Sequence, residues 1–306
     1  MDRFESMSVF AAIVEEGGFS AASRRLGMPV ATVSRKLAEL EAHLKAQLLT
    51  RTTRKVTSTQ QGEQFYHDCR RILSELAEAE RTAAGEYGAA RGELVVTAPL
   101  VFGRLHVMPV VADFLAAYPD ITVNMVLSDR ILNLQDEQLD VAIRIGELPD
   151  SSMTVVRLGH VSWIVCAAPS YLTRAMRPSH PRELSTHDCV AFTNSGGLTE
   201  WAFRESGEAK RYSIIPRLTV NSAEAAISAA SAGSGITRVL SYQAEAALRR
   251  GELERLLAEF EPEPLPVSLT FSGARFMAQK LRAFIDFAGP RLRARLAALE
   301  VKPPLT

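Results

Sequence analysis

The feature that most constrains the fold of this 306-residue chain is the spacing of glycines in its first 45 positions. Apolar residues recur at helical spacing over Arg3–Glu16 and stop at Gly17-Gly18, which is typical of a helix end. A short helix is expected over Ala21–Leu26, with Gly27 as its stop, and a third helix at about Ala31–Leu44. Three short helices joined by tight turns predict a helix-turn-helix, whose third helix would enter the major groove of DNA.

The second and third helices carry the residues expected to hold and to use this motif. Ser20 is expected to cap the second helix. The apolar face of the third helix would consist of Val33, Leu37, Leu40 and Leu44. On its solvent face, the Arg35 guanidinium can span the O6 and N7 atoms of guanine, and Thr32 can offer a hydroxyl to a phosphate and a methyl to thymine. Three-helix bundles without a DNA function share this pattern, so that alternative stays open.

Charge is distributed unevenly along the chain. The whole chain has no net charge, but residues 24–55 contain eight basic and two acidic residues. A basic loop is expected at about Leu48–Thr59, where Arg51, Arg54 and Lys55 are suited to phosphates or to the minor groove. A basic N-terminal segment on an otherwise acidic chain favours a nucleic-acid partner. An unevenly charged, solvated surface without a partner is the alternative.

From Gln61 to about Glu86, the sequence predicts one long helix with a narrow apolar seam. Its residues follow one another at steps of four and three, as in a heptad repeat: Phe65, Cys69, Ile72, Leu76, Ala79 and Ala83. Charged residues such as Arg70, Arg71 and Glu78 flank the seam. We expect the seam to pair with a second copy of the chain, and the alternative is that it packs on its own domain.

Strands and helices alternate beyond the glycine-rich residues 85–92, which predicts an α/β domain with a largely parallel sheet. The expected strands are Glu93–Ala98, Ile121–Leu127, Val141–Ile145, Ser162–Ala168, Arg217–Val220 and Ser268–Phe271. The expected helices are Val107–Tyr118, Ile131–Gln138, Ser170–Ala175, Ala223–Ala232 and Gln279–Leu299. The predicted fold class is therefore α/β with an all-α head.

The sequence carries no motif for catalysis, metal binding or export. It has no HExxH, GxSxG or Walker A pattern, and Gly233-Ser234-Gly235 fails as a dinucleotide fingerprint because Arg238 takes the place of the third glycine. The histidines lack metal-ligand spacing, and the three cysteines form no CxxC pair. With no signal peptide and no run of 18 apolar residues, we expect a cytoplasmic protein that is not an enzyme and has no cofactor, metal or membrane partner. A small-molecule binding or transport module and an enzyme with a regulatory head are the alternatives.

LysR-type transcriptional regulators have a DNA-binding head that closely resembles the segment FAAIVEEGGFSAASRRLGMPVATVSRKLAELEAHLKAQLLTRTTRKVTSTQQGEQFY. The family pattern contains GSFSAAA..LG, VSR.I..LE..LG..LF.R and LT.AG. The chain matches it in residue type and spacing at Gly18, Phe19, Ser20, Ala21, Ala22, Leu26, Gly27, Val33, Ser34, Arg35, Leu40, Glu41, Leu44, Leu48, Arg51, Thr57 and Gly62. It departs from the pattern at Pro29-Val30-Ala31, where many relatives have Ser-Gln-Pro and thus a cap and an amide base reader, and at Ala46-Gln47 and Leu49. Later segments fit as well, so the resemblance covers nearly the whole chain.

The resemblance implies a winged helix-turn-helix at residues 1–59, a dimerisation helix at 60–87 and an effector-binding domain at 88–306 that is similar to periplasmic binding proteins. Two α/β lobes would form this domain, one from residues 92–161 plus 267–299 and one from 162–266. The implied partners are double-stranded DNA with a dyad-symmetric promoter site, a small-molecule effector such as a small organic or aromatic acid, and further copies of the chain in a homodimer or homotetramer. The candidate DNA contacts are Ser20, Val30, Ala31, Thr32, Ser34, Arg35, Lys36, Arg51, Thr52, Thr53, Arg54 and Lys55.

The effector is expected between the lobes, at the carboxyl ends of strands, where helix N-termini present free amides. The candidate contacts there are Thr97, Pro99, Leu100, Ser128, Asp129, Arg144, Gly146, Thr193, Asn194 and Asn221. The Arg144 fork could bind a carboxylate through two hydrogen bonds, or instead pair with an acidic neighbour (Asp140, Asp129 or Glu147). The Thr97 hydroxyl could help to cradle an anion, or simply cap the following helix.

Overall fold

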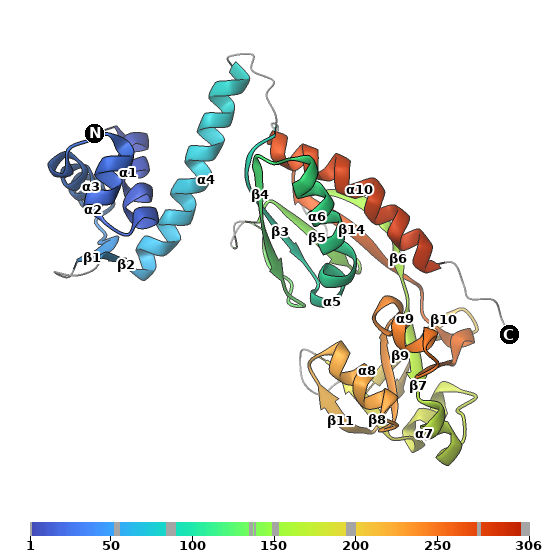
Figure 1. The fold of residues 1–306 in the computed structure, drawn as a ribbon. Helices are drawn as coiled ribbons and strands as arrows, with labels where there is room; N and C mark the ends of the chain where they lie inside the picture. The colour runs from blue at the N-terminus through green and yellow to red at the C-terminus, as the bar shows by residue number, and fades with distance from the viewer. Residues whose placement is uncertain are drawn as a thin grey trace. The chain divides into compact units, whose positions relative to one another are not determined.

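The chain divides into two compact units, the head at residues 1–89 and the body at residues 90–306. The structure is a computed structural model that describes residues 2–51, 56–83, 90–134, 137, 139–148, 153–193, 200–273 and 277–300. Each unit is described separately below, with the element labels of Figure 1.

The described part of the head consists of helices and one two-stranded hairpin (Figure 1). In chain order the elements are α1 (Arg3–Glu16), α2 (Phe19–Leu26), α3 (Val30–Leu44), β1 (Leu49–Arg51), β2 (Val56–Ser58) and α4 (Gln60–Ala83). Gly17 and Gly27 end α1 and α2 in the left-handed region, with φ angles of 71° and 64°. β1 and β2 pair antiparallel, so the predicted basic loop contains the hairpin of a winged helix-turn-helix, here called the wing.

Two details of the head differ from expectation. Ser20 does not cap α2, because the helix begins at Phe19, two residues earlier than expected, with Gly18 as its N-cap, and Ser20 lies exposed in the first turn. Leu44 is not part of the apolar face of α3 and is 37% exposed, because the chain leaves the helix at this point through the left-handed Lys45. The other predicted residues of this face are buried in the head core, which also contains residues of α1, β1 and α4.

The first half of α4 packs on its own head. Cys69 is fully buried in the head core, and the ring centroid of Phe65 lies 5.7 Å from that of Phe10 on α1. The expectation that these two seam residues pair with a second copy is therefore wrong, because α1 already covers them. Ile72 and Leu76, further along the seam, are half-buried, and the side chains of Ala79 and Ala83 lie outside the described residues.

The first lobe of the body is a five-stranded sheet in the order β4-β3-β5-β14-β6. Its strands are β3 (Gly92–Ala98), β4 (Ile121–Leu127), β5 (Val141–Ile145), β6 (Met153–Val161) and β14 (Leu265–Ser272). A continuous helical segment follows β3 as α5 (Leu100–Phe102), a π-helical turn η1 (Gly103–Val107) and α6 (Met108–Ala117), and α10 (Gln279–Glu300) ends the described chain. α6 and α10 lie together on one face of the sheet (Figure 1), where Phe114 and Phe284 stack edge to face at 5.2 Å.

The second lobe is a five-stranded sheet in the order β11-β8-β12-β7-β13. Its strands are β7 (Trp163–Ala167), β8 (Cys189–Phe192), β11 (Pro216–Val220), β12 (Ile236–Leu240) and β13 (Glu254–Leu256). The helices α8 (Ala223–Ser231) and α9 (Ser241–Arg249) bury alanines on one face of this sheet. The other face packs against the hairpin β9 (Glu200–Glu205) and β10 (Glu208–Ser213), α7 (Pro169–Arg174) and a 3-10 turn, η2 (Pro181–Thr186).

Several expectations for the body are wrong. Both sheets are mixed rather than largely parallel, because β14 and β7 run antiparallel to their neighbours. The helix expected from Val107 begins at Leu100. The described residues of the predicted helix Ile131–Gln138 are not helical, and β14 begins at Leu265, so the first lobe resumes two residues before the expected position.

One helical segment has the length and mean hydropathy of a membrane span. Over Leu100–Ala117 the mean hydropathy is 1.5. Core helices of soluble proteins share these properties, and this segment contributes Val107, Val110 and Phe114 to the core of the first lobe. It is therefore weak evidence for a membrane span.

Candidate DNA-binding surface and ligand cavity

The candidate base-reading residues of α3 lie opposite its buried face. Arg35 is 69% exposed, and Ala31, four residues earlier on the same side, is also exposed. The Arg35 guanidinium lies 3.5 Å from the Glu39 carboxylate one turn later, an exposed pair that is weak enough to exchange for another acceptor. Val30 is exposed, while Thr32 and Ser34 are half-buried beside this stripe.

Lys36, one of the expected DNA contacts, is engaged within the head. Its side chain is 16% exposed, and its ammonium pairs with the Glu5 carboxylate of α1. The position directly before the buried Leu37 turns Lys36 toward α1 instead of toward solvent. The wing candidates Thr52, Thr53, Arg54 and Lys55, and the side chain of Arg51, lie outside the described residues.

Two matched motif residues attach the wing to the helices. The Glu41 carboxylate of α3 accepts hydrogen bonds from the backbone amides of Leu48 and Leu49, at 2.8 and 3.2 Å. Gly62 of α4 approaches the same turn so closely that a Cβ atom there would lie 1.9 Å from the Leu48 carbonyl oxygen. Both residues thus position the start of the wing, and this structural role accounts for a glutamate and a glycine at these positions without any contact to DNA.

A cavity of about 200 Å³ opens between the two lobes of the body. The first lobe contributes Thr97, Ala98, Pro99, Ser128, Asp129, Arg130, Ile131, Ile143, Arg144, Ile145 and Leu265. The second lobe contributes Trp163, Phe192, Leu240, Tyr242 and Gln243. The cavity is smaller than the pockets of roughly 300–1,000 Å³ that hold drug-sized ligands, so it suits a small molecule.

The charged groups of the cavity have different surroundings. The Asp129 carboxylate accepts a hydrogen bond from the Leu100 amide at 2.9 Å and so caps the helical segment that begins there. The Arg144 guanidinium donates to the Leu132 carbonyl and makes no ion pair with any residue that the structure describes. Partial burial lowers the pKa of Arg144 from its usual value, because the charged form loses hydration. Asp140, a partner considered for Arg144, instead pairs with Lys280 at 3.1 Å.

Five of the candidate effector contacts meet in this cavity: Thr97, Pro99, Ser128, Asp129 and Arg144. The Thr97 hydroxyl donates to the Val126 carbonyl at 2.7 Å, and it does not cap the helix, whose N-cap is Pro99. Of the remaining candidates, Leu100, Gly146, Thr193 and Asn221 do not line the cavity, and Asn194 lies outside the described residues. The Leu100 amide already serves Asp129, and Gly146 turns away at a φ of 110° to donate to the Pro266 carbonyl.

The aromatic wall of the cavity was not expected from the sequence. Trp163 lies at the start of β7, and the Arg238 guanidinium stacks 4.7 Å from the centroid of one of its rings. Tyr242 of α9 contacts two rings of the first lobe, Phe102 at 5.3 Å and His106 at 5.6 Å. These residues come from strand and helix starts in the second lobe, where an isolated aromatic residue gives no sequence signal that distinguishes a cavity wall from a core.

The cysteines of the chain are unreactive core residues. Cys69, Cys166 and Cys189 are all buried, and burial raises the pKa of each thiol to about 12. Within the part of the chain that the structure describes, no group of three or more His, Cys, Asp or Glu side chains could hold a metal ion.

Known proteins resemble the chain over both units. Residues 4–63 match the family described as "Bacterial regulatory helix-turn-helix protein, lysR family", and residues 88–293 match the "LysR substrate binding domain". An HTH-type transcriptional regulator of Xanthomonas campestris is 34% identical over 93% of this chain and 84% of the relative. The regulator CrgA of Neisseria meningitidis serogroup B is 34% identical over 92% of this chain and 95% of the relative.

Solved full-length structures extend this similarity to the fold. CrgA from Neisseria meningitidis has a TM-score of 0.60 at 32% identity, covering 94% of this chain and 98% of that chain. The virulence activator AphB of Vibrio cholerae has a TM-score of 0.60 at 30% identity, with the same coverage. These relatives are transcriptional regulators and not enzymes, which confirms the expectation for this chain. The chain therefore belongs to the LysR family of transcriptional regulators, with an N-terminal helix-turn-helix and a C-terminal substrate-binding domain.

Proposed function

We propose that this LysR-type regulator reads a specific DNA sequence with the outer stripe of α3 and senses a small anion between the lobes of its body. The exposed Arg35 guanidinium carries the first part of this proposal. It lies on the solvent side of the third helix of a winged helix-turn-helix, where an arginine fork can recognise guanine in the major groove. Ser20, Val30, Ala31, Thr32 and Ser34, with Arg51 to Lys55 of the wing, are the proposed neighbouring contacts to bases or phosphates.

The charge of the cavity supports an anionic effector. Two guanidinium groups, of Arg130 and Arg144, and one carboxylate, of Asp129, line it, and the Asp129 carboxylate is occupied by the Leu100 amide. Arg144 is the proposed carboxylate ligand because it has no acidic partner among the described residues and is partly desolvated. Trp163 and Tyr242 would contact the apolar part of a small organic or aromatic acid.

The remaining apolar seam of α4 supports pairing of two chains. Ile72 and Leu76 are only half-buried in the single chain, and Ala79 and Ala83 continue the same spacing. Paired heads would read a dyad-symmetric promoter in the cytoplasm, as a homodimer or within a homotetramer.

The test of base reading is the Arg35→Ala variant. Binding is measured to a double-stranded site selected by the wild-type protein from a randomised DNA library, and to random DNA, at two salt concentrations. We expect wild-type affinity to fall steeply as salt rises, because phosphate contacts release counterions. Arg35→Ala should lose about 1–3 kcal/mol on the selected site and much less on random DNA.

Lys36→Ala is the matched control. It removes the same charge from the next position of α3, but from a side chain that pairs with Glu5. It should leave the discrimination between selected and random DNA unchanged. If Arg35→Ala lost equal affinity for selected and random DNA, Arg35 would be a phosphate contact and not a base contact. A wild-type protein without salt-sensitive DNA binding would contradict the proposed function.

A further inference from the structure

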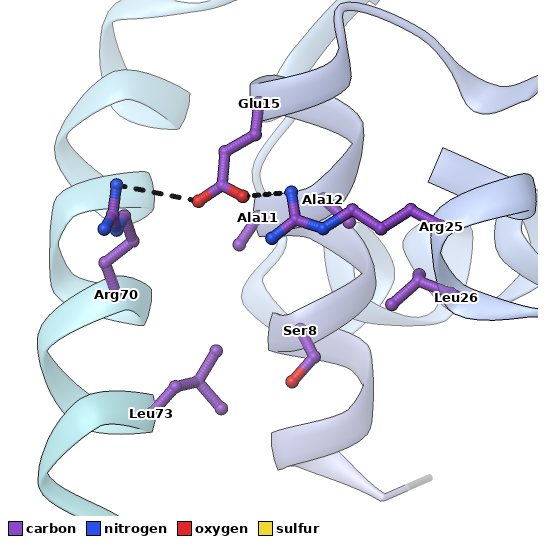
Figure 2. Close-up of a pocket in the computed structure, with 8 residues that line it drawn as sticks. All are labelled: Ser8, Ala11, Ala12, Glu15, Arg25, Leu26, Arg70 and Leu73. Carbon is purple, nitrogen blue, oxygen red and sulfur yellow. Dashed lines mark hydrogen bonds and ion pairs between the residues drawn. The ribbon is translucent and has the colours of Figure 1, made fainter. Parts of the chain in front are cut away.

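Glu15, near the end of α1, joins three helices of the head (Figure 2). Its carboxylate accepts a hydrogen bond from the Arg25 guanidinium of α2 and another from the Tyr66 hydroxyl of α4, the latter at 3.0 Å. It also lies 3.7 Å from the Arg70 guanidinium of α4. The Glu15 side chain is 23% exposed and those of Arg25 and Arg70 are 49% and 47% exposed, so each ion pair is largely solvated and weak on its own, and the role of Glu15 lies in joining several partners at once.

A hollow lies directly beside this carboxylate, between α1 and α4. The cavity measures about 240 Å³. On the α1 side it is lined by small residues, Ser8, Ala11 and Ala12, and on the α4 side by Leu73, one turn after Arg70 (Figure 2). Apolar packing attaches α4 to the head core around the buried Cys69 and the half-buried Phe65 and Tyr66. The polar contacts of Glu15 reach α4 at Tyr66 and Arg70, on either side of Cys69 in the sequence, and they join this same stretch of α4 to α1 and α2 beside the hollow.

We propose that Glu15 is a positioning residue for DNA recognition, which sets the tilt of α4 relative to the helix-turn-helix by joining α2 and α4 through one carboxylate. The inference rests on the proposed function, in which α4 pairs two chains. In such a pair, the tilt of α4 determines the distance and rotation between the two recognition helices. The partners of Glu15 given above lie on α2 and α4 and not on α3, so each head keeps its own base contacts when Glu15 is replaced.

The experiment measures the preference for the spacing of the two half-sites. The probe is a double-stranded site selected by the wild-type protein from a randomised library, in variants with one to five base pairs inserted between its halves, together with an isolated half-site. The wild-type protein should prefer one spacing. For Glu15→Gln, we expect the ratio of affinities between the best spacing and a spacing one base pair longer to fall about threefold or more. Affinity for the isolated half-site should stay within about twofold of wild type, since a preserved base contact leaves this quantity unchanged.

Two further variants separate positioning from charge and folding. Glu16→Gln removes the same charge at the next residue. The Glu16 carboxylate lies 3.3 Å from Arg25 and makes no hydrogen bond or ion pair with the described residues of α4, so this variant should keep the wild-type spacing preference. Tyr66→Phe removes only the hydroxyl that α4 offers to Glu15, and it should weaken the preference in the same direction as Glu15→Gln.

Two results would overturn the assignment. In the first, Glu15→Gln keeps the wild-type spacing preference. In the second, it loses affinity equally for the half-site and the full site, which identifies a general structural role. A wild-type protein that binds the selected site without any spacing preference would instead contradict the pairing through α4, and the positioning role with it.

Discussion

Glu41 of α3 and Gly62 of α4 both position the start of the wing. Glu41 accepts hydrogen bonds from its backbone, and Gly62, which has no side chain, lets α4 approach it closely. The Glu41 carboxylate accepts hydrogen bonds from the amides of Leu48, just before β1, and of Leu49, the first residue of β1. The Thr59 hydroxyl donates to the Gln47 carbonyl at 2.8 Å, with the Leu48 carbonyl next nearest at 3.2 Å, and it accepts from the Gly62 amide at 2.9 Å. The family pattern shows Glu41 and Gly62 as matches, but only the structure reveals that both contact the turn at Leu48.

Gly62→Ala should destabilise the head. A Cβ atom 1.9 Å from the Leu48 carbonyl oxygen forces the backbone of α4 and the turn apart, at a cost of about 1–3 kcal/mol. Urea unfolding of the full-length protein, followed by circular dichroism, should show an earlier transition. Gln61→Ala, at the exposed neighbouring position, is the control and should unfold like wild type. Coincident unfolding curves for Gly62→Ala and wild type would show that the turn accommodates the added methyl group without a loss of stability.

His106 makes the stability of the body sensitive to acid. Burial, with a smaller effect of Arg295, lowers the pKa of its imidazole from 6.5 to about 4. Between pH 6.5 and pH 4, the unfolded chain protonates this imidazole while the folded chain keeps it neutral. The free energy of unfolding therefore has its full value above pH 6.5 and decreases as the pH falls toward 4. Stability should fall by about 2 kcal/mol between pH 7 and pH 5 from this group.

The His106→Phe variant tests this origin, because it keeps an aromatic ring between Phe102 and Tyr242 but cannot be protonated. Denaturant unfolding at pH 7 and pH 5 should show a smaller loss of stability than in wild type. His160→Phe, at an exposed position on β6, should retain the wild-type difference. An unchanged pH dependence in His106→Phe would assign the acid sensitivity to other groups.

At the scale of secondary structure, the helices of the head could be predicted because their ends are marked by glycine. The bounds of α1 match the prediction, and α2 and α3 differ from it by one or two residues at their starts. The predicted helix at residues 131–138 fails for a physical reason. Leu132, Leu134 and Leu139 lie flat against the second face of the sheet around Ala142, while Ile131 is 90% exposed. Apolar spacing alone does not distinguish this covering segment from a helix.

Strands β6, β9 and β10 escaped prediction for a different reason. β6 has only two buried residues, Leu158 and Val161, so it lacks the apolar pattern of a central strand. β9 and β10 pair through exposed charged residues and bury chiefly Trp201 and Phe203. Their position depends on distant partners, which no local window of sequence contains.

The second half of α4 carries the remaining apolar seam, and a substitution in this seam tests whether it pairs two chains. Leu76→Glu should dissociate paired chains, because it places a carboxylate in a helix–helix contact where it finds no compensating partner. Sedimentation velocity should show a shift toward the monomer. Arg71→Glu adds a carboxylate to an exposed position of the same helix and should leave the mass unchanged. An unaltered mass for Leu76→Glu would exclude this part of the seam from the interface.

At the scale of the whole molecule, half of the ligand cavity could be predicted and half could not. Thr97, Ser128 and Arg144 end neighbouring strands of one sheet, so strand order brings them together. Trp163 and Tyr242 reach the cavity only because the chain crosses between the lobes after β6 and returns before β14. That closure is a property of the complete body, and it was visible in the sequence only through resemblance to a family.

Arg144→Met tests the proposed ligand site. A thermal-shift screen of small carboxylic acids on the wild-type protein supplies the probe, since a bound ligand raises the melting temperature. The affinity of Arg144→Met for that acid should fall about tenfold or more, because a charge-assisted hydrogen bond is lost. Arg157→Met, an exposed arginine on β6 outside the cavity lining, should bind like wild type. Equal affinities of wild type and Arg144→Met would place the acid elsewhere.

The carboxylate of Asp129 at the helix that begins with Leu100 has a consequence for how selective such a sensor is. A bare helix start attracts any anion, and a cell contains abundant phosphate and other inorganic anions. Here the first amide is already neutralised by the chain itself, so a simple ion gains little by entering. In the proposed site, a molecule that reaches both the guanidinium of Arg144 and the rings of the opposite lobe would gain more free energy than a simple ion, so we expect inorganic anions to be poor effectors.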